Sequence, residues 1–182
     1  MLGVVFTEFL DMVEDKFDLD TVDAILDDAN VKSGGAYTAV GSYDHQEVVA
    51  LVVALSRRTS VPIDDLIHTF GHHLTGRFAQ LYPGFFENIS DPFDFFETVD
   101  QHIHREVKKL YPNAQLPTIS TERIDEQTMV VTYRSHRSFG KLAEGLIQGS
   151  LDHFNCQATL QMEDTSTGDA STARFVITKK SE

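Results

Sequence analysis

The stretch that decides the fold is Met129-Val-Val-Thr-Tyr133-Arg-Ser135-His-Arg137. Its β-branched first half follows the polar turn at residues 125–127, and this pattern predicts a strand. Side chains alternate between the two faces of a strand, so Tyr133, Ser135 and Arg137 should point to one side. If the strand persists, Tyr133 and Arg137 stand about 13 Å apart along it. This row suits an anion with several oxygens, because Arg137 can grip a carboxylate with two hydrogen bonds. The same spacing also fits an ordinary solvated strand face.

The composition is that of a globular protein. The chain has 182 residues, 41% of them hydrophobic and 24% charged, so we expect a single domain over residues 1–182. The formal net charge of −13 argues against nucleic acid as a partner, because neutralising phosphates requires clustered Lys and Arg. We expect no membrane association, because no apolar run approaches the roughly 20 residues needed to span a bilayer. We expect a cytoplasmic location, because a chain with a single cysteine fits a reducing compartment. Cys156 is the only cysteine, which excludes an internal disulfide.

Two periodicities divide the chain. Up to about residue 112 apolar residues recur at helical spacing, whereas from Pro117 onward the period is two. Helices are predicted at 2–17, 20–29, 45–55, 62–81, 91–111 and about 138–154, and strands near 118–124, 128–135, 156–163 and 172–179. The predicted class is therefore α+β, with a mainly helical part over about 1–112 and a sheet-containing part over about 113–182. The sheet should be four-stranded and antiparallel.

Two histidines lie in the predicted helix 91–111. Taking Ile103 as the centre of its buried face, His102 and His104 flank that face on either side at about 100° per residue. The pattern alone does not choose between them, and neither one demands a ligand role. His68 and His72 could share a metal, but no His-Glu-x-x-His arrangement supports a zinc site there. The apolar stripe of the helix comprises Phe93, Phe96, Val99, Ile103, Val107 and Leu110.

The segment Tyr133-Arg-Ser135-His-Arg137 resembles the Tyr-x-Ser-x-Arg haem-propionate motif of the H-NOX family. These haem nitric oxide/oxygen binding (HNOB) domains are related to the haem domain of soluble guanylate cyclase, and the chain is similar to the stand-alone bacterial type. Phe70-Gly71 and the helical stretch 144–149 are also similar to the family. The resemblance implies a helical part packed on an antiparallel sheet, with haem b (protoporphyrin IX iron) buried between them and held non-covalently.

The resemblance also chooses between the two histidines. In related domains a hydrophobic residue stands three positions after the iron ligand, and Tyr-Pro follows about two turns on. His104, with Val107 and Tyr111-Pro112, fits that spacing better than His102. Tyr133, Ser135 and Arg137 would bind the propionates, Pro117 would pack against the macrocycle, and four residues would line the distal side. The implied cofactor-binding residues are His104, Tyr133, Ser135, Arg137, Pro117, Val5, Phe9, Leu142 and Leu146, with His104 as the metal ligand.

The same comparison bears on the gas. Oxygen-binding members of the family carry a tyrosine nine residues after the motif tyrosine, whose hydroxyl donates to bound oxygen. That position is Leu142 here, and no tyrosine occurs between Ser138 and Phe154. Losing one such hydrogen bond costs about 1.5–3 kcal/mol. The resemblance therefore implies a ferrous-haem sensor selective for nitric oxide over oxygen, with carbon monoxide as a further ligand.

A signalling mechanism is implied in the same way. Nitric oxide binding would weaken the iron–His104 bond and shift the conformation. This sequence has no kinase or cyclase region of its own, so a separate partner is expected, either a histidine kinase or a cyclic-di-GMP enzyme. The chain itself is expected to be a monomer.

Two alternative functions differ in class from a haem sensor. An enzyme is not expected, because the sequence has no nucleophile motif, no phosphate-binding glycine loop and no paired metal-ligand signature. A small-molecule or metal-binding module without haem is the second alternative. Colour discriminates among them, since a haem protein purifies red with a Soret band.

Overall fold

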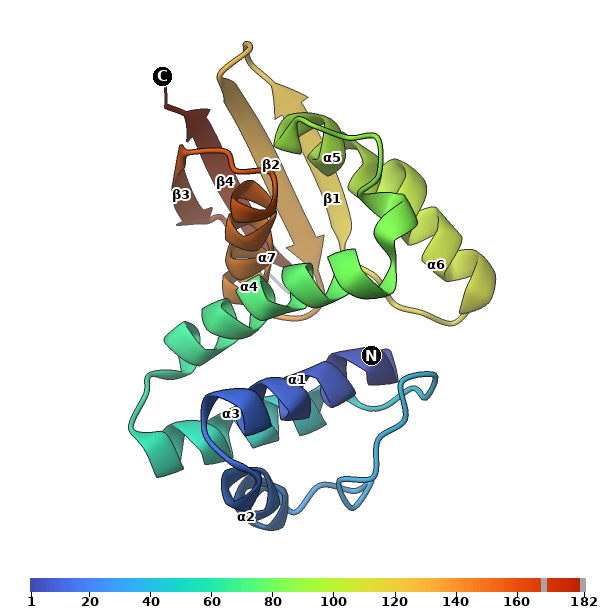
Figure 1. The fold of residues 1–182 in the computed structure, drawn as a ribbon, viewed down its shortest axis with the longest axis vertical. Helices are drawn as coiled ribbons and strands as arrows, with labels where there is room; N and C mark the ends of the chain where they lie inside the picture. Colours follow the sequence, from blue (N-terminus) through green and yellow to red (C-terminus); the bar gives the residue numbers. More distant parts are fainter. Residues whose placement is uncertain (168–169, 181–182) are drawn as a thin grey trace. The chain divides into compact units, whose positions relative to one another are not determined.

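The computed structural model describes residues 1–167 and 170–180 (Figure 1). Its helices are α1 (Gly3–Lys16), α2 (Leu19–Ala29), α3 (His45–Thr59), α4 (Ile63–Leu81), α5 (Pro92–Thr98), α6 (His104–Leu110) and α7 (Gly140–His153). Its strands are β1 (Thr118–Arg123), β2 (Thr128–Ser135), β3 (Ala158–Asp164) and β4 (Ser171–Lys179). The predicted α+β class, with helices first and an antiparallel sheet later, is confirmed.

The chain divides into two compact units, Met1–Phe70 and Gly71–Glu182. Secondary structure changes type near residue 112, as predicted, but the compact units divide earlier. The reason is that α5 packs against β1, so the helices after Phe70 belong with the sheet.

The first unit is built from α1, α2, α3 and the beginning of α4. Phe6, Phe9 and Leu51 are fully buried in it, and Phe70 meets Phe9 edge to face at 5.1 Å between ring centroids. Helix α2 is capped by Asp18, whose carboxylate accepts a hydrogen bond from Thr21 N at 2.7 Å. The helix begins at Leu19, one residue earlier than predicted.

Asp44 and Glu47, three residues apart at the start of α3, have the spacing of a capping box, but that box does not form. Asp44 accepts a hydrogen bond from Gln46 N at 3.0 Å. The carboxylate of Glu47 instead accepts hydrogen bonds from the hydroxyls of Ser33 (2.5 Å) and Tyr37 (2.9 Å). Burial, with the Glu47 contact adding to it, raises the pKa of Tyr37 to about 12. Glu47 therefore fastens the loop before α3 rather than the helix end.

The second unit is organised by the sheet, which over the described residues has four strands in the order β1-β2-β4-β3, all antiparallel. Strand β2 pairs with β4 so that Met129 lies opposite Ile177, Val131 opposite Phe175, and Tyr133 opposite Ala173. All these side chains are buried, and they form a continuous apolar row on one face. Tyr133 is thereby placed at the end of a buried row, next to Ile119 of β1.

Helix α7 packs on β3 and β4, and α4 lies close against it in the same unit (Figure 1). Glycine makes this approach possible, because a Cβ on Gly71 would clash with Leu142 O and lie 2.9 Å from Leu146 N. A Cβ on Gly149 would likewise lie 2.8 Å from His72 O. The hydroxyl of Thr75 donates to Leu146 O at 3.0 Å across the same contact.

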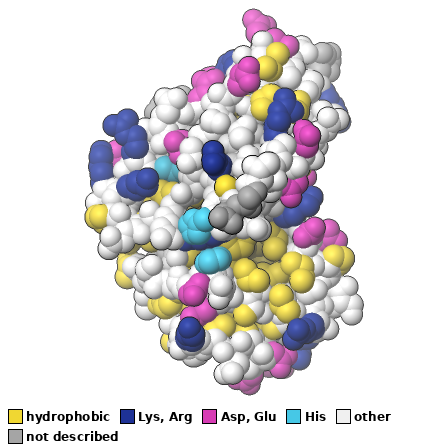
Figure 2. All heavy atoms as spheres, turned by 180° about the vertical axis from the view of Figure 1, so that it is seen from behind, with side chains coloured by type: hydrophobic (Ala, Val, Ile, Leu, Met, Phe, Trp, Pro, Cys, Tyr) yellow, Lys and Arg dark blue, Asp and Glu magenta, His cyan; other side chains and the backbone are white. Residues whose placement is uncertain are grey.

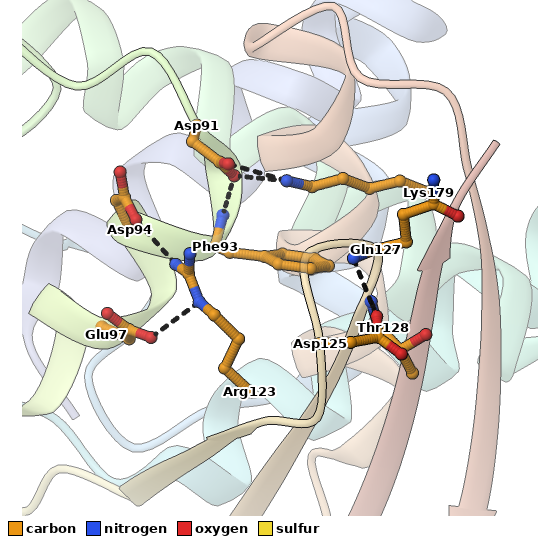
Figure 3. A network of polar contacts seen from close by, with 9 residues as sticks. All are labelled: Asp91, Phe93, Asp94, Glu97, Arg123, Asp125, Gln127, Thr128 and Lys179. Carbon is orange, nitrogen blue, oxygen red and sulfur yellow. Dashed lines mark hydrogen bonds and ion pairs between the residues drawn. The ribbon is translucent and has the colours of Figure 1, made fainter. Parts of the chain in front are cut away.

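Helix α5 is fastened to the sheet by charged side chains around one buried ring (Figure 3). Asp91 caps α5 by accepting from Phe93 N at 2.8 Å, and it also pairs with Lys179 of β4 at 2.7 Å. The Lys179 ammonium lies 4.0 Å from the centre of the Phe93 ring. Arg123 of β1 bonds Asp94 at 2.6 Å and Glu97 at 3.1 Å. The start of α5 is therefore held by two strands.

The surface carries charges of both signs. On the face shown in Figure 2, acidic and basic side chains are interspersed. Among the residues described, no helix is both long and apolar enough to cross a membrane.

Candidate functional site

His104 follows an irregular turn of the helix in which it was predicted. The single helix expected over 91–111 is instead α5, a π-helical segment at Val99–Ile103, and α6. The backbone N–H of His104 bonds to Val99 O, five residues back. This turn therefore holds one residue more than a regular α-helical turn. Such π turns occur frequently at functional sites.

The two histidines have different surroundings. The side chain of His104 is 17% exposed. His102 is exposed, and its ring lies edge to face against Phe85 at 5.9 Å. The apolar stripe of this helix is buried only at its beginning, since Phe93 and Phe96 are buried, whereas Leu110 is 76% exposed. The prediction that Leu110 belongs to the core is therefore wrong.

Asp100 supplies the partner that the sequence did not name. Its Oδ1 lies 3.0 Å from Nδ1 of His104, one turn along the π segment. The same oxygen accepts a long hydrogen bond, 3.5 Å, from Ile119 N in β1. A carboxylate only accepts hydrogen bonds, so this contact places a proton on Nδ1 and leaves Nε2 of a neutral imidazole with its lone pair. The histidine is thus oriented as metal-ligating histidines usually are.

Tyr133, Ser135 and Arg137 lie together, but not in the extended row expected. Strand β2 ends at Ser135 and the chain bends, so the hydroxyl of Tyr133 donates to Arg137 O at 3.2 Å. The backbone N–H of Arg137 donates to Ser135 Oγ at 3.1 Å. The strand does not continue to Arg137, so the condition for a spacing of about 13 Å is not met. The bend gathers the three residues into one cluster.

The electrostatics of this cluster suit an anion. Arg137 is buried, 8% exposed, and carries the positive charge. Burial raises the pKa of Tyr133, although Ser135 and Arg137 act in the opposite direction, so its phenol remains a neutral donor. A buried cation with neutral donors around it favours a carboxylate ligand.

Gln115 is a second residue that sequence reasoning missed. It lies in the linker between α6 and β1, and both of its oxygens face the Arg137 guanidinium. Nη1 donates to Gln115 O at 3.1 Å, and Nη2 donates to Gln115 Oε1 at 3.1 Å. No local pattern marks this residue, because its partner is 22 positions away.

The other predicted site residues are distributed over both units. Pro117 is half-buried and immediately precedes β1. Leu142 and Leu146 are half-buried on α7 of the second unit. On α1 of the first unit, Val5 is half-buried and Phe9 is fully buried.

The residues present fit a haem group. His104 offers one imidazole nitrogen for iron, and the cluster around Arg137 offers a buried cation for carboxylates. In residues 1–167 and 170–180, no group of three or more His, Cys, Asp or Glu side chains is placed to hold a metal ion. An iron ligated by one imidazole needs its other ligands from elsewhere, and a porphyrin supplies them.

Comparison with known proteins also indicates a haem-binding protein. Residues 2–162 match a family model described as Haem-NO-binding. The Fe(II) unliganded H-NOX protein from K. algicida is 36% identical, with a TM-score of 0.91 over 100% of this chain and 98% of that one. The IWP-051-bound H-NOX from Shewanella woodyi, in the Fe(II)CO state, is 36% identical, with a TM-score of 0.83 over 99% of this chain and 95% of that one.

A more distant structure shares the fold. A mutant of the T. Tengcongensis H-NOX is 20% identical and has a TM-score of 0.90 over 100% of this chain and 98% of that one. No curated protein sequence gave a significant match. The match to the family model spans most of the chain, and it agrees with the imidazole and guanidinium geometry described above. The chain belongs to the Haem-NO-binding (HNOB, H-NOX) family of haem-based gas sensors.

Proposed function

We propose that residues 1–182 form one sensor domain that binds ferrous haem b and responds to nitric oxide in preference to oxygen. The observation that carries this proposal is the His104 imidazole, whose Nδ1 is engaged by Asp100 while Nε2 keeps its lone pair. The related protein from K. algicida is described as Fe(II) unliganded and that from Shewanella woodyi as Fe(II)CO. These descriptions support ferrous haem as the cofactor here, with carbon monoxide as a second ligand.

Each end of the cofactor would be held by its own residues. His104 would bind the iron through Nε2, and Asp100 would hold the ring in the tautomer and orientation that this requires. Tyr133, Ser135 and Arg137 would bind the propionates, since they combine a buried cation with two hydroxyl groups. Pro117 would lie against the macrocycle.

Selectivity would come from an apolar distal side. Ferrous haem held by His104 would supply an iron that binds a diatomic gas, and nitric oxide would weaken the iron–His104 bond. Leu142 and Leu146 on α7 would face the gas without offering a hydroxyl. A polarised oxygen ligand would then lack a hydrogen bond worth about 1.5–3 kcal/mol, one to two decades of affinity. Nitric oxide carries less charge and would lose less.

The response would start at the π segment. His104 is the first residue of α6, and Asp100 ties this turn to Ile119 of β1. Release of the imidazole would free α6 while the start of α5 stays fastened to β1 and β4 through Arg123 and Lys179. Two arrangements of α6 would then differ in population, and a separate histidine kinase or cyclic-di-GMP enzyme would read the difference. The chain would act in the cytoplasm, as a monomer and without catalysing a reaction.

The experiment that tests this function is a gas titration of the reduced protein. Ferrous protein exposed to nitric oxide, carbon monoxide and air should form the first two complexes and no stable oxygen complex, as followed by the Soret band. Leu142→Tyr supplies the missing hydroxyl and should slow loss of oxygen by about ten- to a hundredfold. Leu142→Phe is the matched control, with the ring but no hydroxyl. A stable oxygen complex of the unmodified protein in air would refute selectivity, and a colourless protein that takes up no hemin would refute haem binding.

A further inference from the structure

Both oxygens of Gln115 accept hydrogen bonds from the guanidinium of Arg137. The backbone carbonyl accepts from Nη1 and the side-chain Oε1 accepts from Nη2, each at 3.1 Å. Gln115 itself is exposed, whereas Arg137 is 8% exposed. An exposed residue thus binds a buried cation. Gln115 is not one of the buried hydrophobic residues that form the core.

The contact fixes the direction of the guanidinium. The guanidinium is planar, and its N–H donors have a fixed fork geometry, so two acceptors on one residue set both its position and its plane. The main chain of Arg137 is held separately, through Tyr133 Oη to its carbonyl and its N–H to Ser135 Oγ. Both ends of the long side chain are therefore held, which reduces the rotamers that it can adopt.

The chemistry of the amide matters as well. Aspartate or glutamate at this position would neutralise Arg137 and compete with any anion for it. The two oxygens of Gln115 are uncharged, so they orient the guanidinium without neutralising it. A carboxylate ligand takes parallel N–H donors from the same planar group, so the edge that Gln115 holds determines where the remaining edge points.

We propose that Gln115 is a positioning residue for Arg137, holding the guanidinium in the orientation that binds a haem propionate. This inference rests on the proposed haem function. Gln115 also lies in the linker that begins where α6 ends. It therefore connects the C-terminal end of α6 to the cluster of Tyr133, Ser135 and Arg137.

The test uses the full-length haem-loaded protein and the Gln115→Leu variant. Hemin transfer from the ferric protein to excess apomyoglobin should be at least about tenfold faster in the variant, as expected for one lost hydrogen bond to a charged group. The propionate bands of the resonance Raman spectrum should shift as well, which a merely structural role would not cause. Asn113→Leu, in the same linker and equally exposed, is the matched control and should change neither readout.

A double-mutant cycle separates positioning from general loosening of the linker. A lysine ammonium cannot donate the two parallel hydrogen bonds that Arg137 makes to Gln115. In an Arg137→Lys background, the further change Gln115→Leu should therefore have no effect on hemin release. An equal effect in both backgrounds, or no effect in either, would overturn the proposal for Gln115. If Arg137→Lys speeds hemin release while Gln115→Leu does not, only this inference fails. A wild-type chain that takes up no hemin would overturn both this inference and the proposed function.

Discussion

At the scale of single residues, His104, the proposed iron ligand, has a partner that local spacing did not reveal. His104 and Asp100 are four residues apart, a separation that is ordinary on a helix and shared by many pairs. What singles them out is the second contact of Asp100, to Ile119 N in β1, which is a long-range feature. A charged partner on Nδ1 makes the imidazole a stronger donor to a metal at Nε2.

We expect Asp100→Asn to weaken the donor strength of His104 without unfolding the protein. The amide keeps the size of the side chain and removes its charge. Metal ligands that lose such a partner typically lose about 10–100-fold in affinity. The iron–histidine stretching band in the resonance Raman spectrum of the ferrous protein should move to lower frequency. Asp152→Asn, which alters the exposed pair with His72 at 2.8 Å, is the control, and an unchanged band in Asp100→Asn would contradict the role given to this carboxylate.

The cluster of Tyr133, Ser135 and Arg137 was partly predictable at this scale. Strand alternation placed Tyr133, Ser135 and Arg137 on one side, and the structure brings these three residues together. The bend after Ser135 was not predictable, because it is set by hydrogen bonds that Tyr133 and Ser135 make to Arg137 itself. Gln115 could not be found from the sequence, since nothing local pairs it with a residue 22 positions away.

At the scale of elements, glycine decides how closely α4 and α7 pack. Gly71 and Gly76 lie on the same helix, but only Gly71 faces α7. A Cβ on Gly71 would meet backbone atoms of Leu142 and Leu146, whereas a Cβ on Gly76 would meet nothing within 4 Å. Backbone atoms cannot rotate away, so α7 would have to shift as a whole.

The two glycines should therefore respond in opposite directions to alanine. Gly76→Ala should stabilise the protein by about 0.5–1 kcal/mol, because alanine is the better helix former. Gly71→Ala should lower the free energy of unfolding by about 1–3 kcal/mol, because overpacking outweighs the same helical gain. Urea denaturation of both variants measures the difference. Equal stabilisation by the two substitutions would show that α4 and α7 are not in close contact at Gly71.

A second element-scale feature is the anchoring of α5 (Figure 3). Partial burial alone would raise the pKa of Asp91, but its hydrogen bonds with Lys179 and Phe93 N, and the nearby positive charges, together hold that pKa below the ordinary value of 3.8. A carboxyl whose pKa is lowered in the folded state stabilises the protein above its unfolded pKa. That contribution is lost as the pH falls below 3.8 through the folded-state pKa.

We expect Lys179→Met to lower the free energy of unfolding near neutral pH by about 1–2 kcal/mol. The change removes both the ion pair with Asp91 and the cation over the Phe93 ring, and keeps an apolar stem. In acid, the difference between wild type and Asp91→Asn should shrink as the pH falls below 3.8. Chemical denaturation over a pH series measures both effects, and Lys180→Met, at an exposed neighbour, is the control. A gap between wild type and Asp91→Asn that stays constant in acid would contradict the lowered pKa.

The π-helical segment Val99–Ile103 could not be predicted from the sequence. Apolar spacing in 91–111 gave the helix and its start at Asp91–Pro92. The spacing could not give the extra residue in the turn Val99–Ile103, because the hydrogen bond from His104 N to Val99 O is stabilised by contacts of this turn with β1.

At the scale of the whole molecule, periodicity was sufficient for the class and order of the elements. Helical spacing before residue 112 and alternation after Pro117 correspond to the helices and to strands β1 to β4. The division into compact units was not evident, since nothing in the sequence of α4 marks a boundary between Phe70 and Gly71. Which helices join the sheet is determined by long-range pairs such as Asp91 with Lys179.

The central claim for the molecule is that His104 ligates a haem iron. The most direct measurement compares His104→Gly and His102→Gly, purified with and without added imidazole, by the Soret band and the iron–imidazole stretch of the ferrous protein. The account predicts that His104→Gly loses haem unless imidazole is supplied and then regains a five-coordinate imidazole spectrum, while His102→Gly behaves as wild type. Retention of haem with an unchanged iron–histidine band in His104→Gly, or dependence on imidazole in His102→Gly instead, would contradict it.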